Sequence, residues 1–174
     1  SEDEKMEELI KRSEDKLRKL EEDVRRLLEE IRRRAEDNTR RNERTLREIE
    51  RTLREIPNDK ELADRLRELL ERLRRRNEEL KRELDKLLRD LERKLEELKR
   101  RHKEKLDRLR DRVRKTGVTE ELVRELEKID RETTEVVKKL LEELKDIMRR
   151  VHERSEESLR EAKKILREVE ERAR

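Results

Sequence analysis

The stretch LADRLRELLERLRRRNEELKRELDKLLRDLERKLEELKRRHKEKLDRL, residues 62–109, decides the fold because its leucines recur every 18 residues. Leu62, Leu80 and Leu98 form one such series, and two others begin at Leu70 and Leu73. Because about 18 residues complete five turns of an α-helix, positions at this spacing stay on one side of a straight helix. The flanking segments keep the same interval. The sequence therefore predicts nearly straight helices, each with one apolar stripe.

The composition favours packed helices over a broad globular core. Of the 174 residues, 61% are charged and 28% are hydrophobic, and neither aromatic residues nor cysteine occur. High charge alone is also typical of disorder, but here the apolar residues are periodic and 55 bases nearly balance 51 acids. Such a composition with helical periodicity indicates a helical bundle or coiled coil.

The same composition argues against several partners. Basic runs at 32–34 and 74–76 are followed closely by acids, and no aromatic side chain is present to stack on a base, so we expect no nucleic acid partner. No apolar run reaches the roughly 18 residues of a membrane span, so we expect no membrane. The acidic first residues indicate no secretory signal, and we expect a soluble chain without a targeting signal.

Two places interrupt the helical pattern. Pro57 cannot continue a helix, and Asn58 is suited to cap the next one in a capping box with Glu61. Gly117 suits the left-handed residue that ends a helix, and Thr119 is suited to cap the third. The sequence thus predicts helices over about 2–56, 59–115 and 119–174. Near-equal lengths and short loops predict an all-α fold, a long antiparallel up-down-up three-helix bundle that forms one domain over 1–174.

Polar residues interrupt the apolar stripes at two levels of this predicted bundle. Residues of adjacent antiparallel helices lie level when their numbers add to a constant, about 118 for the first pair of helices and about 235 for the second. One level holds Ser13, His102 and Thr133. The other holds Asn38, Asn42, Asn77, Ser155 and Ser158. An unpaired buried polar group costs about 1–3 kcal/mol. We therefore expect each level to be a buried hydrogen-bond network that penalises slipped registers.

These residues also permit chemical interpretations, which we consider weaker. His102 and His152 fall at different levels, and no cysteine or Glu-x-x-His motif accompanies them, so we expect neither a metal nor a cofactor. Ser13 with His102 lacks an evident third catalytic residue, so we expect no enzyme and no small-molecule substrate. A pH switch at His102 is an alternative, although such switches usually cluster several histidines.

Taken together, these features resemble a family: computationally designed (de novo), parametric helical bundles with buried hydrogen-bond networks. The resemblance covers the whole chain and rests on the apolar stripes, the charged surface, the two loops and the polar levels. The residues that carry it in the loops and levels are Pro57-Asn58-Asp59, Thr116-Gly117-Val118-Thr119, Asn38, Asn42, Asn77 and His102. Spectrin repeats are similar in topology, but their buried tryptophans are missing here. The resemblance implies a hyperstable structural scaffold of synthetic origin, without a natural biochemical activity.

Members of this family include monomers and also heterodimers in which three helices of one chain bind a fourth helix of another. Paired apolar residues widen the stripes, and they either close a three-helix core or line a groove for a further helix. The pairs are Leu27/Leu28, Leu69/Leu70, Leu140/Leu141 and Ile147/Met148. We favour a closed monomer because a narrow stripe fits a small seam. The alternatives are a three-helix subunit of a designed hetero-oligomer with a helical partner chain, and symmetric self-association.

Overall fold

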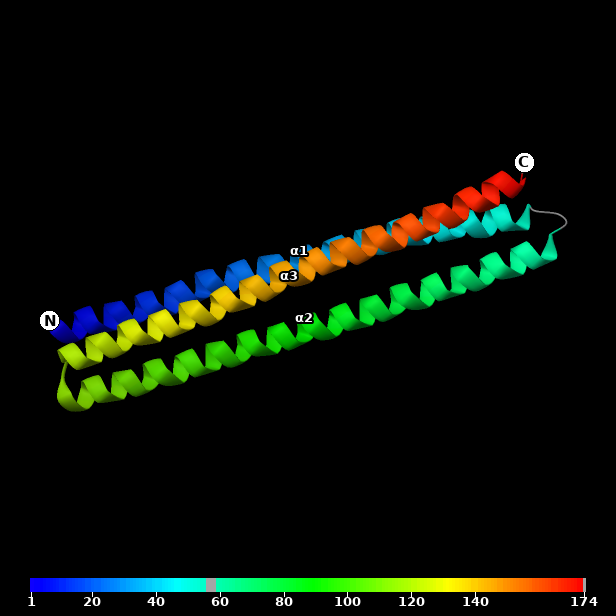
Figure 1. The fold of residues 1–174 in the computed structure, drawn as a ribbon. Coiled ribbons are helices and arrows are strands. Elements are labelled where there is room, and N and C mark those ends of the chain that lie inside the picture. Colours follow the sequence, from blue (N-terminus) through cyan, green and yellow to red (C-terminus); the bar gives the residue numbers. More distant parts are fainter. Residues whose placement is uncertain (56–58, 174) are drawn as a thin grey trace. The chain divides into compact units, whose positions relative to one another are not determined.

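The computed structural model describes residues 1–55 and 59–173. It contains three helices, α1 (Glu2–Arg54), α2 (Lys60–Thr116) and α3 (Glu120–Ala173), and no strand in this described part of the chain. The helices pack against one another, so the predicted all-α three-helix bundle is confirmed (Figure 1). The predicted end of the first helix at Ile56 and the predicted cap at Asn58 lie outside the described residues.

Local side-chain contacts explain where α2 and α3 begin. The Asp59 carboxylate accepts a hydrogen bond from the backbone N–H of Leu62 at 3.2 Å, so Asp59 caps α2. Thr119 Oγ1 accepts one from Leu122 at 3.2 Å, and the prediction that Thr119 caps α3 is confirmed. Gly117 has a φ of 73° in the preceding turn, as its left-handed role requires.

Contacts between residues gather the chain into two compact units, each with a segment of all three helices. Unit 1 comprises Ser1–Glu29 and Leu88–Lys145, and unit 2 comprises Glu30–Leu87 and Asp146–Arg174. The expectation of one domain over 1–174 stays a prediction, and we describe each unit by itself.

Unit 1 has an apolar core supplied by all three helices. One cluster of this core consists of Met6, Ile10, Leu106, Leu109, Leu122, Leu126 and Ile129. Ion pairs fix the helix directions, because Arg110 of α2 pairs with Glu7 of α1, whereas the earlier Lys99 pairs with the later Glu21. Residue numbers therefore rise along α1 in the direction in which they fall along α2, so the two helices run antiparallel in this unit.

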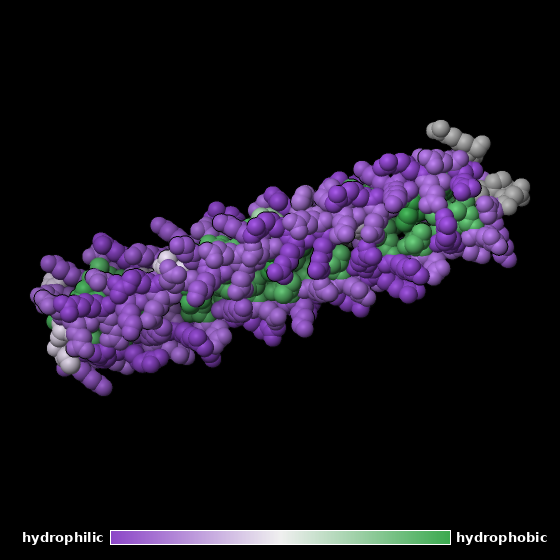
Figure 2. Space-filling view, in the orientation of Figure 1, coloured by the Kyte–Doolittle hydropathy of each residue, from purple (hydrophilic) through white to green (hydrophobic). Residues whose placement is uncertain are grey.

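Unit 2 repeats the arrangement with a second core cluster. This cluster consists of Leu46, Ile49, Leu53, Leu62, Leu66, Leu70, Leu73, Ala162 and Val169. Arg65 of α2 pairs with Glu168 of α3 at 2.6 Å, and the later Arg76 pairs with the earlier Glu161 at 2.8 Å. The helices α2 and α3 therefore run antiparallel here as well. Apolar residues appear as narrow strips between hydrophilic ones in Figure 2, as expected for thin stripes along helix seams.

Candidate functional site: two polar layers

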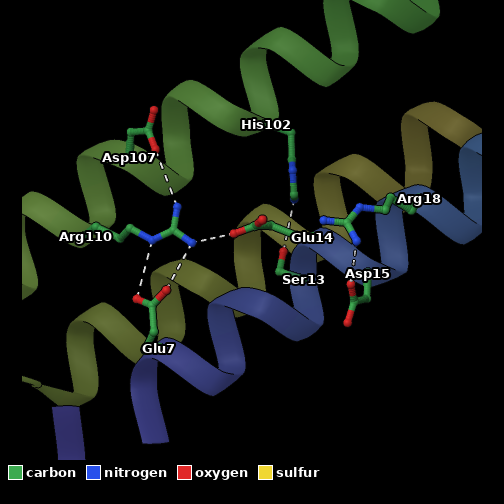
Figure 3. A network of polar contacts seen from close by, with 8 residues as sticks. All are labelled: Glu7, Ser13, Glu14, Asp15, Arg18, His102, Asp107 and Arg110. Carbon is green, nitrogen blue, oxygen red and sulfur yellow. Dashed lines mark hydrogen bonds and ion pairs between the residues drawn. The ribbon is translucent and has the colours of Figure 1, made fainter. Parts of the chain in front are cut away.

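The first polar layer lies in unit 1 and joins all three helices through Ser13. The Ser13 hydroxyl of α1 lies 3.0 Å from Nε2 of His102 on α2, and it also donates a hydrogen bond to the carboxylate of Asp130 on α3. Ser13 and His102 are only 1% and 4% exposed. We call Ser13, His102 and Asp130 the His102 layer; Figure 3 shows its contact between Ser13 and His102.

The single hydroxyl proton of Ser13 sets the direction of these hydrogen bonds. Because that proton goes to Asp130, Ser13 can only accept a hydrogen bond from His102. His102 therefore carries a proton on Nε2. His102 on α2 thus donates to Ser13 on α1, and Ser13 donates to Asp130 on α3.

This connectivity differs from that of a catalytic triad, although the three residue types are the same. In a triad the histidine lies between serine and aspartate and accepts the serine proton. Here Ser13 lies in the middle and donates its hydrogen bond to Asp130, so in this arrangement the Ser13 hydroxyl does not donate to His102. Ser13 is also buried.

Sequence reasoning missed Asp130 and assigned its place to Thr133. Thr133 is buried, but no hydrogen bond joins it to Ser13 or His102 within the described residues. Asp130 is half-buried and also forms an ion pair with Lys16 at 3.8 Å. In a chain with 61% charged residues, one further aspartate carries no signal of its own. The only available signal was spacing, since Asp130 lies three residues before Thr133 and thus on nearly the same face of α3.

The surroundings of His102 favour its neutral form. Burial lowers its pKa below the ordinary value of 6.5, because desolvation disfavours the imidazolium ion. The charges of Asp130 and Glu14 oppose this effect, and Lys105 reinforces it. His102 thus faces titratable groups from all three helices, and burial outweighs the two carboxylates.

A cluster of ion pairs lies next to this layer on α1 and α2. Arg110 forms hydrogen bonds with Glu7 at 3.2 Å and with Glu14, and it lies 3.5 Å from Asp107 (Figure 3). Burial alone would lower the pKa of Arg110, but its hydrogen bonds to Glu14 and Glu7 raise it. The cluster supports the antiparallel pairing of these two helices through charge on the rim of the bundle.

The second polar layer lies in unit 2 and is only partly bonded. The Ser158 hydroxyl donates to the side-chain oxygen of Asn77 at 2.6 Å, which joins α2 and α3. These two residues are the pair that the predicted register places level. Asn42 is 8% exposed, and its side-chain oxygen has no hydrogen-bond partner within the described residues. Asn38 and Ser155 are half-buried. We call these five residues the Asn42 layer.

Two hollows adjoin the Asn42 layer in unit 2. The first has a volume of about 420 Å³, and its walls include Asn38, Asn42, Asn77 and Ser155. The second, of about 390 Å³, shares Asn38 and Val151 with the first and reaches the exposed His152. Short polar side chains stand here where leucine and isoleucine fill the neighbouring levels, and the missing side-chain volume opens the seam.

Comparison with known proteins adds no relative: no protein-family model, no curated protein and no solved structure matches the chain. Among the described residues, no helix combines the length and apolar character that crossing a membrane requires.

Proposed function

We propose that this chain is a designed structural scaffold whose polar layers specify the register and pairing of its helices. The observation that carries the proposal is the His102 layer, in which one buried serine bonds to a residue on each of the other two helices. A slip of one helix by a turn would bury His102 and Ser13 against leucine, and each unpaired group would cost about 1–3 kcal/mol. Apolar contacts are non-directional, so leucine stripes alone would penalise such a slip less.

Covalent cross-linking tests this proposal directly. A zero-length carbodiimide joins lysines to carboxylates that lie in contact, and three pairs between helices of unit 1 lie at 3.4 Å or less. They are Lys99–Glu21 at 3.0 Å, Lys105–Glu132 at 3.3 Å and Lys94–Glu143 at 3.4 Å. Mass spectrometry of the cross-linked peptides then reads the register.

The informative variant combines Ser13→Ala with His102→Leu, which removes the polar groups and keeps the level filled. We expect new cross-links displaced by whole turns, and a mass in light scattering that rises above 21.8 kDa with concentration. The control is Leu106→Met, which changes the adjacent core without removing a polar group. A double variant that keeps the parental cross-links and mass would show that the His102 layer does not specify register.

The alternative function is a three-helix subunit that binds a further helix of another chain. Leu9, Leu87 and Val136 are the large apolar residues that stay exposed within the described residues, and they favour this alternative. Light scattering of the unchanged chain separates the two proposals. A mass near 21.8 kDa at all concentrations supports the scaffold, and a rising mass supports the subunit.

A further inference from the structure

The first hollow of unit 2 has the size and lining of a small-molecule site. Its volume of about 420 Å³ falls within the roughly 300–1,000 Å³ that is typical of ligand pockets. Leu46, Leu80, Leu84, Leu87 and Ile147 supply apolar walls from all three helices. Leu87 is 42% exposed, so the hollow is open to solvent on the side of α2. A ligand with an apolar body would cover this surface.

One buried polar atom in the wall lacks a partner. Asn42 is more than nine-tenths buried, and its side-chain oxygen accepts no hydrogen bond within the described residues. Its neighbour Asn77 is already bonded to Ser158. A buried acceptor without a partner costs about 1–3 kcal/mol. A ligand that brings an N–H or O–H group to Asn42 would remove that cost.

The rim of the hollow leaves two positive charges uncompensated. Its acids are engaged, because Glu43 pairs with Arg47, Glu78 with Arg82, and Glu83 with Arg154. By contrast, Lys81 and Arg150 are exposed and form no ion pair with any described residue. An anionic group on the ligand would therefore find two free cations at the mouth of the hollow.

We propose that this hollow binds a small amphiphilic anion. The ligand has an apolar body that packs on the leucines, one hydrogen-bond donor that reaches Asn42, and one anionic group that faces Lys81 and Arg150. This binding role is independent of the register role of the layers, since it depends on the residues that the Asn42 layer leaves unbonded.

The probe for this site is 8-anilinonaphthalene-1-sulfonate, which carries two aryl groups, one N–H and one sulfonate. We expect saturable binding of one probe per chain in calorimetry, with a matching rise in fluorescence. Asn42→Leu fills the hollow and removes the acceptor, and it should abolish this saturable binding. Thr39→Leu fills the same hollow from a different position on α1 and should do the same, while circular dichroism checks that both variants remain helical.

A pair of charge variants tests the rim. Lys81→Glu with Arg150→Glu should weaken binding of the probe at least about tenfold. The matched control is Lys11→Glu with Arg12→Glu, which changes the net charge equally at exposed positions in unit 1 and should leave binding unchanged. The neutral analogue N-phenyl-1-naphthylamine keeps the rings and the N–H, and its binding should be insensitive to both pairs.

Three results would overturn the proposal. The first is fluorescence that rises without saturation, which indicates adsorption to scattered apolar surface. The second is unchanged binding in the two filled variants. The third is a doubled mass in light scattering together with no binding, which means that a second copy of the chain covers the hollow.

Discussion

Replacing Ser13 by alanine should destabilise the protein far more than the loss of one hydroxyl group suggests. The substitution leaves the Nε2–H of His102 buried without an acceptor, which costs about 1–3 kcal/mol. Asp130 also loses a donor, but it keeps Lys16 nearby and remains partly solvated, so this loss adds only about 0.5–1.5 kcal/mol. We therefore expect the free energy of unfolding to fall by about 2–4 kcal/mol.

Removing His102 as well distinguishes the cost of an unpaired donor from a general effect of the Ser13 substitution. Adding His102→Leu to Ser13→Ala removes the orphaned donor and fills its place with apolar volume, so the double variant should recover to within about 1 kcal/mol of the parent. Guanidinium titration followed by far-UV circular dichroism measures both free energies. The matched control is Ser155→Ala, since Ser155 is half-buried without a hydrogen bond to any described residue. A double variant that is less stable than Ser13→Ala would refute the reasoning.

Three further predictions concern the core, acid and the second turn. Leu95→Ala should lower the free energy of unfolding by about 2–5 kcal/mol because Leu95 is fully buried. Leu87→Ala, at an exposed position, should lower it by about 0.5 kcal/mol or less. Equal losses of stability for the two variants in denaturant titrations would contradict the assigned packing. Acid should destabilise the protein below about pH 6.5, because the pKa of His102 is lowered in the folded state and the unfolded chain therefore binds the proton first. Each tenfold difference in proton affinity between the two states is equivalent to about 1.4 kcal/mol of stability. If the His102→Leu variant loses as much stability over this pH range as the parent does, His102 is excluded as the cause. Gly117→Ala should cost about 1–2 kcal/mol from backbone strain alone, since no atom lies within 4 Å of the added methyl group, and an unchanged melting temperature would mean that the turn adjusts.

The sequence was sufficient for the helices because their signals are local and periodic. The turn at Gly117 and the cap at Thr119 follow from backbone geometry that few other residues satisfy. Loop length and helix rise alone place Asn77 and Ser158 at the same height on adjacent helices. These features need no knowledge of side-chain conformation.

The details of the two polar layers were not predictable in the same way. Whether Asp130 or Thr133 reaches Ser13 depends on side-chain length and rotamer, which a pattern of polar positions does not contain. The unpaired oxygen of Asn42 and the hollow beside it depend on how much volume three helices leave at one level. Sequence spacing gives the positions of these residues, and only their packing tells which of them remain unbonded.

The direction of the hydrogen bonds in the His102 layer has a consequence for spectroscopy. A serine hydroxyl proton is normally invisible in NMR because it exchanges with water too fast. The Ser13 proton is shielded from water and held by a carboxylate, so it should exchange slowly and give a resolved, downfield-shifted signal. The chain has no Phe, Tyr or Trp, so no ring protons of these residues add signals to the same region. The resonance of this one hydroxyl proton would thus report whether the three helices are correctly paired.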